Sequence, residues 1–233
     1  MMLSLEKIDV AIQSAPILRG LSIAVGKGEL VGLVGRNGAG KTTTMRAIMG
    51  LNSPTSGTIC LDGADITRLE AYKRPALGLG YMPEDRRLVP ELTVEENMLL
   101  PAWANRDLDA QAPLELIYDL IPEVTQMRDR KALLLSGGQQ KLVALGRALV
   151  AGSKILLLDE PFEGVAPVLA QRLMEVISAL RKENRSILIA QSELMHSVSL
   201  LDREFVIERG AIVSAEAGAD RAGVKQEQSG DQV

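Results

Sequence analysis

The chain has 233 residues, 46% of them hydrophobic, and a formal net charge of −4, values typical of a soluble globular protein that can bury a sizeable core. This acidic balance gives no reason to expect a nucleic acid as the main partner. A single cysteine, Cys60, excludes an internal disulfide, and no apolar run is long enough to cross a membrane.

The first part of the chain predicts two strands, a third strand and then a helix. Two alternating apolar and polar runs within residues 3–25 are separated by Ser14–Pro16, which predicts antiparallel strands joined by a turn. The short apolar run Glu29–Val34 predicts a fully buried strand, and Thr43–Met49 predicts a helix that ends at Gly50. The loop between this strand and this helix is rich in glycine.

That loop, Gly35–Thr42, reads GRNGAGKT and fits the phosphate-loop pattern GxxxxGK[ST]. Its glycines let the backbone approach a ligand closely, and the N–H groups and dipole of the helix start attract a phosphate. Lys41 can then reach the β- and γ-phosphates, while the Thr42 hydroxyl is placed for Mg²⁺. An ordinary glycine-rich turn would not need all four fixed positions of the pattern, which are Gly35, Gly40, Lys41 and Thr42. The motif therefore predicts a nucleoside triphosphate site.

Short strands and then helices are predicted after the phosphate loop. Thr58–Leu61 and Gly78–Met82 are short apolar runs that predict strands. From about residue 84 to residue 151 the pattern becomes helical, with a capping box in which Thr93 is the N-cap and Glu96 the N3 residue. We expect this region to be a helical lobe inserted between strands of an α/β core.

Alternating strands and helices resume after this lobe. Strands are predicted at Ile155–Leu158 and Ser186–Ala190, with a helix over Val168–Arg181 between them. The remaining predicted elements are a short helix around Glu193–Leu200 and strands at Glu204–Glu208 and Ala211–Ser214. The alternation predicts a largely parallel sheet with crossover connections. Residues 215–233 are polar and small, which predicts a disordered tail.

Two acidic residues, Asp159 and Glu160, directly follow the buried strand Ile155–Leu158. A buried strand that ends in a carboxylate would set Asp159 near an Mg²⁺ held by Thr42. Glu160 comes one residue later, where a carboxylate could polarise the attacking water. The alternative is a core strand that merely emerges into solvent, but the phosphate loop in the same chain favours the catalytic interpretation.

The segment Leu135–Lys141 reads LSGGQQK and places a serine and two glycines at a predicted helix start. Its N–H groups and hydroxyl could hold a second anion. A single γ-phosphate needs only one such site, so the residues leave two alternatives. The segment is either an N-cap without a ligand or a site that completes the nucleotide of another subunit.

The phosphate loop, the LSGGQ signature and the strand ending in Asp-Glu, in this order, resemble those of the ATP-binding cassette ATPases over about residues 1–214. The resemblance implies an α/β fold with a P-loop NTPase core, a mostly parallel sheet, an N-terminal antiparallel β subdomain and an inserted α-helical subdomain. It also implies a head-to-tail dimer, in which the signature of one cassette closes on the ATP of the other. The implied ATP-binding residues are Gly35, Arg36, Asn37, Gly38, Ala39, Gly40, Lys41, Thr42 and Thr43, and the implied contacts across the dimer are Ser136, Gly137, Gly138 and Gln139.

More local motifs resemble the ATPase subunits of branched-chain amino acid importers. These motifs are Met82–Arg87, Glu91–Asn97 and Asp159–Pro167. Such subunits work beside a second ATPase and membrane permease subunits, which are served by a periplasmic substrate-binding protein. The N-terminal residues 1–7 lack the pattern of a signal peptide, so we expect a cytoplasmic protein on the inner face of the membrane, with no nucleic-acid partner. A different small polar solute, such as urea, is an alternative substrate.

Three positions depart from the general cassette pattern. Glu84 stands where a glutamine usually follows the strand near Tyr81; a carboxylate can still meet Mg²⁺ but cannot donate as an amide does. Ile12 stands where an aromatic residue usually stacks on adenine, so the base would rest on an aliphatic patch with weaker base preference. Gln191 replaces the switch histidine and could bond the γ-phosphate without carrying a charge.

The resemblance thus implies a small set of metal-binding and catalytic side chains. The implied Mg²⁺ ligands are Thr42, Asp159 and Glu84, and the implied catalytic residues are Glu160, Lys41 and Gln191. Glu84 and Gln191 leave a second function open, an ATP-gated dimerising clamp with little hydrolysis, against which Glu160 argues. Cassette ATPases that act on nucleic acids commonly carry tandem cassettes or long coiled insertions, and neither pattern occurs in this chain.

Overall fold

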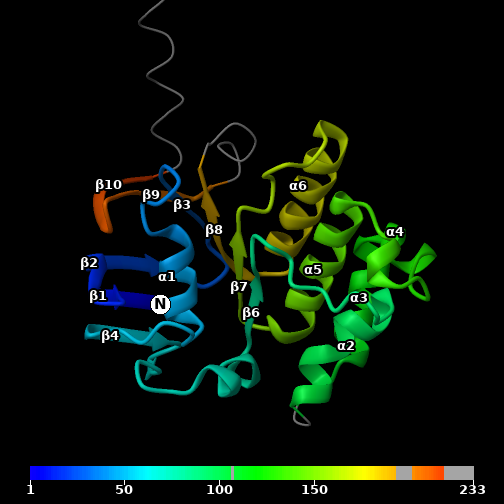
Figure 1. Cartoon of the computed structure of the whole chain (residues 1–233), viewed down its shortest axis with the longest axis horizontal. Helices are drawn as coiled ribbons and strands as arrows, with labels where there is room; N and C mark the ends of the chain where they lie inside the picture. The colour runs from blue at the N-terminus through cyan, green and yellow to red at the C-terminus, as the bar shows by residue number, and fades with distance from the viewer. Residues whose placement is uncertain (106–107, 193–200, 218–233) are drawn as a thin grey trace, which may run out of the picture.

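The computed structural model describes residues 1–105, 108–192 and 201–217, whose strands form two sheets (Figure 1). The smaller sheet is antiparallel, in the order β2-β1-β4-β5. Its strands are β1 (Leu3–Ile12), β2 (Ala15–Val25), β4 (Ser56–Leu61) and β5 (Ala64–Asp65). The expected hairpin is confirmed, but its turn is Gln13–Ser14, because Ala15 and Pro16 already pair with β1.

The larger sheet has the order β10-β9-β3-β8-β7-β6. Its strands are β3 (Leu30–Val34), β6 (Leu79–Met82), β7 (Ile155–Asp159), β8 (Ser186–Gln191), β9 (Arg203–Glu208) and β10 (Ala211–Ala217). All pairings are parallel except that of β10 with β9, which confirms the mostly parallel sheet. β10 extends past its expected end at Ser214, whereas the helix expected at 193–200 and the tail 218–233 lie outside the described residues.

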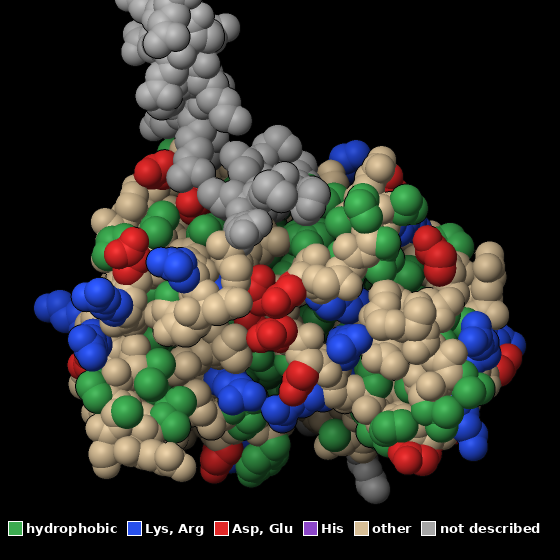
Figure 2. All heavy atoms as spheres, turned by 45° about the horizontal axis from the view of Figure 1, so that its top comes forward, with side chains coloured by type: hydrophobic (Ala, Val, Ile, Leu, Met, Phe, Trp, Pro, Cys, Tyr) green, Lys and Arg blue, Asp and Glu red, His purple; other side chains and the backbone are tan. Residues whose placement is uncertain are grey.

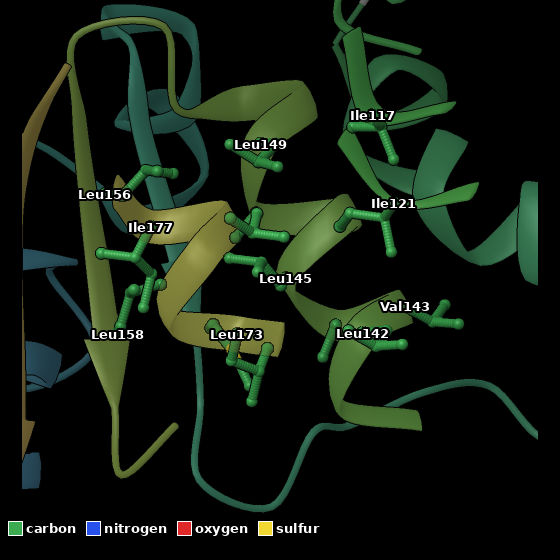
Figure 3. Packing of buried hydrophobic residues seen from close by; sticks show 14 of the residues in the cluster. Ile117, Ile121, Leu142, Val143, Leu145, Leu149, Leu156, Leu158, Leu173 and Ile177 are labelled. Carbon is green, nitrogen blue, oxygen red and sulfur yellow. The ribbon is translucent and has the colours of Figure 1, made fainter. Parts of the chain in front are cut away.

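Strand β7 is buried on both faces, because side chains alternate along a strand. Leu156 and Leu158 belong to a hydrophobic cluster shared with helices α5 (Gly137–Ala151) and α6 (Pro167–Lys182), as Figure 3 shows. Ile155 and Leu157 belong to a second cluster, shared with the smaller sheet and helix α1 (Lys41–Ile48). Burial on both faces explains why residues 155–158 form a continuous aliphatic run. The carboxylate of Asp159 follows at the end of the strand.

Four helices between β6 and β7 form the expected helical lobe beside the larger sheet (Figure 1). They are α2 (Val94–Ala104), α3 (Gln111–Leu120), α4 (Pro122–Gln126) and α5, with the short 3₁₀ helices η1 (Ala71–Lys73) and η2 (Pro75–Leu77) before the lobe and η3 (Ala132–Leu134) within it. The capping box of α2 is confirmed, because Glu96 N donates to Thr93 Oγ1 (3.1 Å) and Thr93 N donates to Glu96 Oε2 (2.7 Å). Across residues 1–105, 108–192 and 201–217, no helix combines the length and the apolar character that a bilayer crossing requires.

A buried arginine fixes the far end of the helix that follows the phosphate loop. Arg74 is 1% exposed and donates to the carbonyl oxygens of Ala47 (3.0 Å) and Ile48 (2.5 Å), which belong to the last turn of α1. It also donates to Leu69 O (2.8 Å). Helix C-termini leave carbonyl groups without intrahelical partners, and here a guanidinium satisfies them. Burial lowers the pKa of Arg74. Its hydrogen bonds anchor the C-terminal end of α1.

Candidate active site

The phosphate loop joins β3 to α1, and its shape depends on glycine at two positions. A Cβ at Gly35 would lie 2.3 Å from the carbonyl oxygen of Ile207, so strand β9 leaves no room for a side chain there. Gly40, the N-cap of α1, has a φ of 116°, which a side chain would strain. No side chain caps the first turn of α1, so the backbone N–H groups of that turn are available to bind an anion.

A cavity of about 400 Å³ opens beside this loop. Its lining residues are Ile17, Asn37, Gly38, Gly40, Lys41, Thr42, Thr43, Glu84 and Glu160. Arg36 and Ala39 instead line a second cavity of about 440 Å³, together with Ile207, Glu208 and Arg209, and Asn37 and Gly38 line both cavities. Ile12, at the end of β1, is 42% exposed and is not among the residues that line the first cavity; Ile17 is the aliphatic residue there.

Lys41 is buried at the start of α1, and its ammonium group donates to carbonyl oxygens of the phosphate loop. Its side chain is only 5% exposed. Nζ donates to the carbonyl oxygens of Gly35 (2.6 Å) and Arg36 (3.2 Å). It also forms an ion pair with Glu160 Oε1 at 3.1 Å. The cation of the phosphate loop and the expected catalytic carboxylate therefore lie in direct contact.

Asp159 is fully buried at the carboxyl end of β7 and accepts hydrogen bonds from two hydroxyl groups. Thr42 Oγ1 donates to its Oδ1 and the Tyr81 hydroxyl donates to its Oδ2, each at 3.2 Å. Burial raises the pKa of Asp159 to about 6, and the negative charges of Glu84 and Glu160 add to the rise, while both hydroxyl bonds oppose it. Burial and the Asp159 charge in turn raise the pKa of Tyr81.

The donor set around Asp159 fits a magnesium ion that completes its shell with substrate phosphates and water. Mg²⁺ usually takes one or two carboxylates plus phosphate oxygens rather than an all-protein cage. The Thr42 hydroxyl and the Asp159 carboxylate are adjacent, and the exposed Glu84 lines the same cavity. Within the described ranges no group of three His, Cys, Asp or Glu side chains could hold a metal by itself.

Glu160 follows β7 in a left-handed backbone conformation (φ 48°) and is 6% exposed. Its N–H donates to Ala190 O at 3.0 Å. This bond ties it to the end of β8, where Gln191 is 5% exposed. Gln191 pairs with Val34, and its carbonyl oxygen accepts from Gly35 N at 3.1 Å. Parallel pairing of β3, β8 and β7 thus brings Lys41, Glu160 and Gln191 together at the carboxyl ends of these three strands.

The LSGGQ signature begins α5 and lies apart from the phosphate loop. Ser136 is the N-cap, and it forms a reciprocal capping box with Gln139 (3.0 and 3.3 Å). A Cβ at Gly138 would lie 2.4 Å from Cδ2 of Leu169, so a larger residue there would force that side chain to move. These three residues line a separate cavity of about 680 Å³, and no described residue lines both this cavity and that of the phosphate loop. Arg86 Nη1 donates a long hydrogen bond of 3.5 Å to the carbonyl oxygen of Gly137.

Sequence reasoning missed Lys141, which connects the signature helix to the segment after β7. It is 5% exposed, and its ammonium donates to the carbonyl oxygens of Glu160 (2.8 Å), Pro161 (3.2 Å) and Glu163. Burial lowers the pKa of Lys141. The only signal in the sequence is a cation directly after LSGGQQ. On the face of α5 that carries Lys141, the neighbouring residues Ala144, Leu145 and Ala148 are apolar.

Charges of both signs are mixed on the face of the molecule that Figure 2 shows. Figure 2 shows acidic side chains grouped near the middle of one face, with Lys and Arg side chains beside them and apolar side chains between. A nucleic-acid-binding surface usually carries a basic stripe or patch. The face drawn in Figure 2 has no such continuous basic stripe among the described residues.

Known proteins share both the sequence and the fold. The family model described as ABC transporter matches residues 18–163. The branched-chain amino acid transport ATP-binding protein BraG of Pseudomonas aeruginosa is 34% identical over 218 residues, or 94% of each chain. The lipopolysaccharide export ATP-binding protein LptB of Haemophilus influenzae is 34% identical over 91% of this chain and 89% of its own. The ADP conformation of the ATP-binding cassette MJ1267 superposes with a TM-score of 0.82 at 29% identity, covering 94% of this chain and 92% of its own. The chain therefore belongs to the ABC transporter family, as an ATPase subunit that energises transport.

Proposed function

We propose that this ATPase subunit serves an importer of branched-chain amino acids. The observation that carries the substrate class is the similarity to BraG, which extends over 94% of both chains. The motifs Met82–Arg87 and Asp159–Pro167 also resemble those of such importers. The equally high identity to LptB makes lipopolysaccharide export the competing function. The transported molecule never touches this subunit, so the choice between the two needs a transport measurement.

The catalytic roles that we assign rest on the convergence of the phosphate loop, the end of β7 and the end of β8 in one site. Lys41 and the N–H groups at the start of α1 bind the phosphates and neutralise their charge. The Thr42 hydroxyl and the Asp159 carboxylate would hold Mg²⁺, with Glu84 at the cavity wall. When bound, the metal neutralises charge on the β- and γ-phosphates. Glu160 polarises the attacking water, and Gln191, at the end of β8, contacts the γ-phosphate.

A second ATPase subunit would complete each site. The signature residues Ser136, Gly138 and Gln139 line their own cavity, and none of them lines the cavity beside the phosphate loop of the same chain. Head-to-tail pairing of two subunits would place each signature over the other's nucleotide. Partner permeases would then couple closure and opening of this pair to transport, with a periplasmic binding protein supplying the substrate outside. Such a subunit works at the inner face of the membrane.

The transport proposal is tested by disrupting the gene in its host and measuring uptake of radiolabelled leucine, isoleucine and valine at submicromolar concentrations. We expect uptake of all three to fall at least tenfold, and a plasmid copy of the wild-type gene to restore it. The matched control is a copy carrying Glu160→Gln, which should be produced normally and restore nothing. Unchanged leucine uptake would refute the assignment. Lost urea uptake would then indicate a polar-solute importer, and lipopolysaccharide missing from the outer membrane would indicate an exporter.

The nucleobase would rest on an aliphatic surface, with Ile12 at the position of the usual aromatic and Ile17 at the cavity wall. Stacking of a base on an aromatic ring contributes about 1–3 kcal/mol. We therefore expect Ile12→Tyr to tighten ATP binding about tenfold, which corresponds to about 1.4 kcal/mol. Titration with a fluorescent ATP analogue measures this change. The control is Leu51→Tyr, an exposed aliphatic residue just after α1 (55% exposed). Equal affinities in both variants would exclude Ile12 from the base site.

A further inference from the structure

Tyr81 donates a hydrogen bond to the carboxylate that we assign to the metal, although no motif of the sequence gives this tyrosine a role. It lies in β6 and is partly buried. We propose that Tyr81 is a positioning residue, which holds Asp159 so that one carboxylate oxygen is presented to the metal, and that it thereby makes the site prefer Mg²⁺ to Ca²⁺. This inference rests on the proposed role of Asp159 as a Mg²⁺ ligand.

Tyr81 and Asp159 point to the same face of the larger sheet. Tyr81 pairs with Leu157 in the neighbouring strand β7, and Asp159 comes two residues after Leu157. Side chains two residues apart lie on the same face of a strand. Leu157 belongs to the cluster that the sheet shares with α1, and Tyr81 packs against that cluster. The phenol ring is therefore supported by apolar side chains, and its hydroxyl reaches the carboxyl end of β7.

The two oxygens of the Asp159 carboxylate have different surroundings. Thr42 Oγ1 donates to Oδ1 and the Tyr81 hydroxyl donates to Oδ2, each at 3.2 Å. Thr42 lines the cavity beside the phosphate loop, whereas neither Asp159 nor Tyr81 is among the residues that line it. Oδ1 is therefore the oxygen on the cavity side, and Oδ2 is the oxygen held on the side of β6.

Tyr81 is the donor that can keep its bond to Asp159 when a metal binds. The Thr42 hydroxyl is itself a proposed metal ligand, so its bond to Oδ1 would give way to the metal. The terminal torsion of an aspartate side chain is broad, and the remaining bond at Oδ2 fixes the plane of the carboxylate. Hydrogen bonds from residues behind a metal ligand commonly orient that ligand and strengthen metal binding.

The same bond should discriminate between cations. The positive end of the Tyr81 O–H dipole points at Oδ2, so it would repel a cation that also contacted this oxygen. Mg²⁺ is small and demands near-ideal octahedral geometry, whereas the larger Ca²⁺ can bind one or both oxygens of a carboxylate. A carboxylate with one available oxygen therefore suits Mg²⁺. Loss of the hydroxyl would leave Oδ2 available for the second contact that Ca²⁺ can use.

The experiment measures the affinity of a fluorescent ATP analogue for Tyr81→Phe in EDTA, in Mg²⁺ and in Ca²⁺. Phenylalanine keeps the ring that packs against the apolar cluster. We expect the affinity in Mg²⁺ to fall about tenfold, a usual effect of losing a bond to a metal ligand. The affinities in EDTA and in Ca²⁺ should stay at the wild-type level, so the preference for Mg²⁺ over Ca²⁺ falls by the same factor.

The matched control is Tyr118→Phe, because the Tyr118 hydroxyl also donates to a carboxylate, that of Glu95, in the helical lobe. This variant should leave all three affinities unchanged. For Tyr81→Phe, equal losses in Mg²⁺ and Ca²⁺ or a loss already present in EDTA would show a purely structural role and overturn the proposal. An unchanged preference for Mg²⁺ would also overturn it.

Asp159→Asn separates a failure of this proposal from a failure of the metal site itself. That variant should lose the gain in affinity that Mg²⁺ gives, and addition of Tyr81→Phe should then cause no further loss, because the ligand that Tyr81 orients is already gone. A further loss in the double variant would overturn the positioning role. A wild-type gain from Mg²⁺ in Asp159→Asn alone would instead refute the role of Asp159 as a ligand.

Discussion

Glu160→Gln is expected to lower the rate of ATP hydrolysis by at least about a hundredfold, the usual contribution of a positioned general base, while ATP binding persists. The amide keeps the size of the side chain and can still accept a hydrogen bond from Ser192. It cannot take up a proton from water or pair with the Lys41 ammonium as a charge. The groups to which we assign phosphate binding, Lys41 and the N–H groups at the start of α1, remain in place. Phosphate release and binding of a fluorescent ATP analogue, measured on the same preparation, test both halves of the prediction.

The matched control for Glu160→Gln is Glu163→Gln. Glu163 is an exposed carboxylate three residues later; its backbone carbonyl accepts a hydrogen bond from Lys141, and its charge acts on Lys141 without a side-chain hydrogen bond between them. Its neutralisation should leave turnover unchanged. Hydrolysis in Glu160→Gln within twofold of the wild-type rate would mean that another group activates the water. A parallel loss of ATP binding would mean that the Glu160–Lys41 ion pair organises the phosphate site.

The parts of the site that could be predicted from the sequence are those encoded by consecutive residues. The phosphate loop combines a glycine turn with the start of a helix, so Gly35–Thr42 carries its own geometry. The same is true of the aliphatic run that ends in Asp159 and Glu160, and of the capping box at Thr93. Strand and helix types followed from hydrophobic periodicity. In each case the forces involved act over a few residues.

The order of the strands and the contacts across them could not be predicted in this way. Pairing of β3 with β8 and β9 brings together segments more than 150 residues apart, and no local pattern specifies such a pairing. Tyr81 reaches Asp159 only because β6 lies beside β7. Ser192 and Lys141 look like an ordinary turn residue and an ordinary helix residue in the sequence. Their hydrogen bonds depend on carbonyl and carboxylate groups supplied by distant elements.

Asp159→Asn should abolish magnesium-dependent hydrolysis and, at the same time, stabilise the nucleotide-free protein. The cause of the second effect is that Asp159 is fully buried, which raises its pKa from the ordinary 3.8 to about 6. A raised carboxyl pKa means that the charged form is disfavoured in the folded state, and each pKa unit corresponds to about 1.4 kcal/mol. A neutral amide avoids that cost and can still bond Thr42 and Tyr81. We expect the free energy of unfolding at pH 8 to rise by about 1–3 kcal/mol.

The pH dependence of this gain has a definite sign. Between pH 3.8 and about 6 the folded wild-type protein binds more protons at Asp159 than the unfolded chain does, so its stability falls as the pH rises through that window. The advantage of Asp159→Asn should therefore be small near pH 4, grow up to about pH 6 and stay constant above it. Urea unfolding in EDTA at pH 5 and pH 8 measures this trend.

Addition of Mg²⁺ and ATP should reverse the order of stability, because a ligand that binds only the folded state stabilises the protein that binds it more tightly. The wild type has, beside Thr42, the carboxylate that we assign to the metal, whereas the amide variant offers only a weak ligand. A variant that is less stable than the wild type in EDTA at pH 8 would show that the Asp159 charge is already compensated by Thr42 and Tyr81. A variant that is stabilised equally by Mg²⁺ and ATP would remove Asp159 from the metal site. We expect the variant to be the more stable protein in EDTA and the wild type to be the more stable one with Mg²⁺ and ATP. Such a reversal would show that the buried Asp159 charge serves ligand binding, since the fold alone is more stable without it.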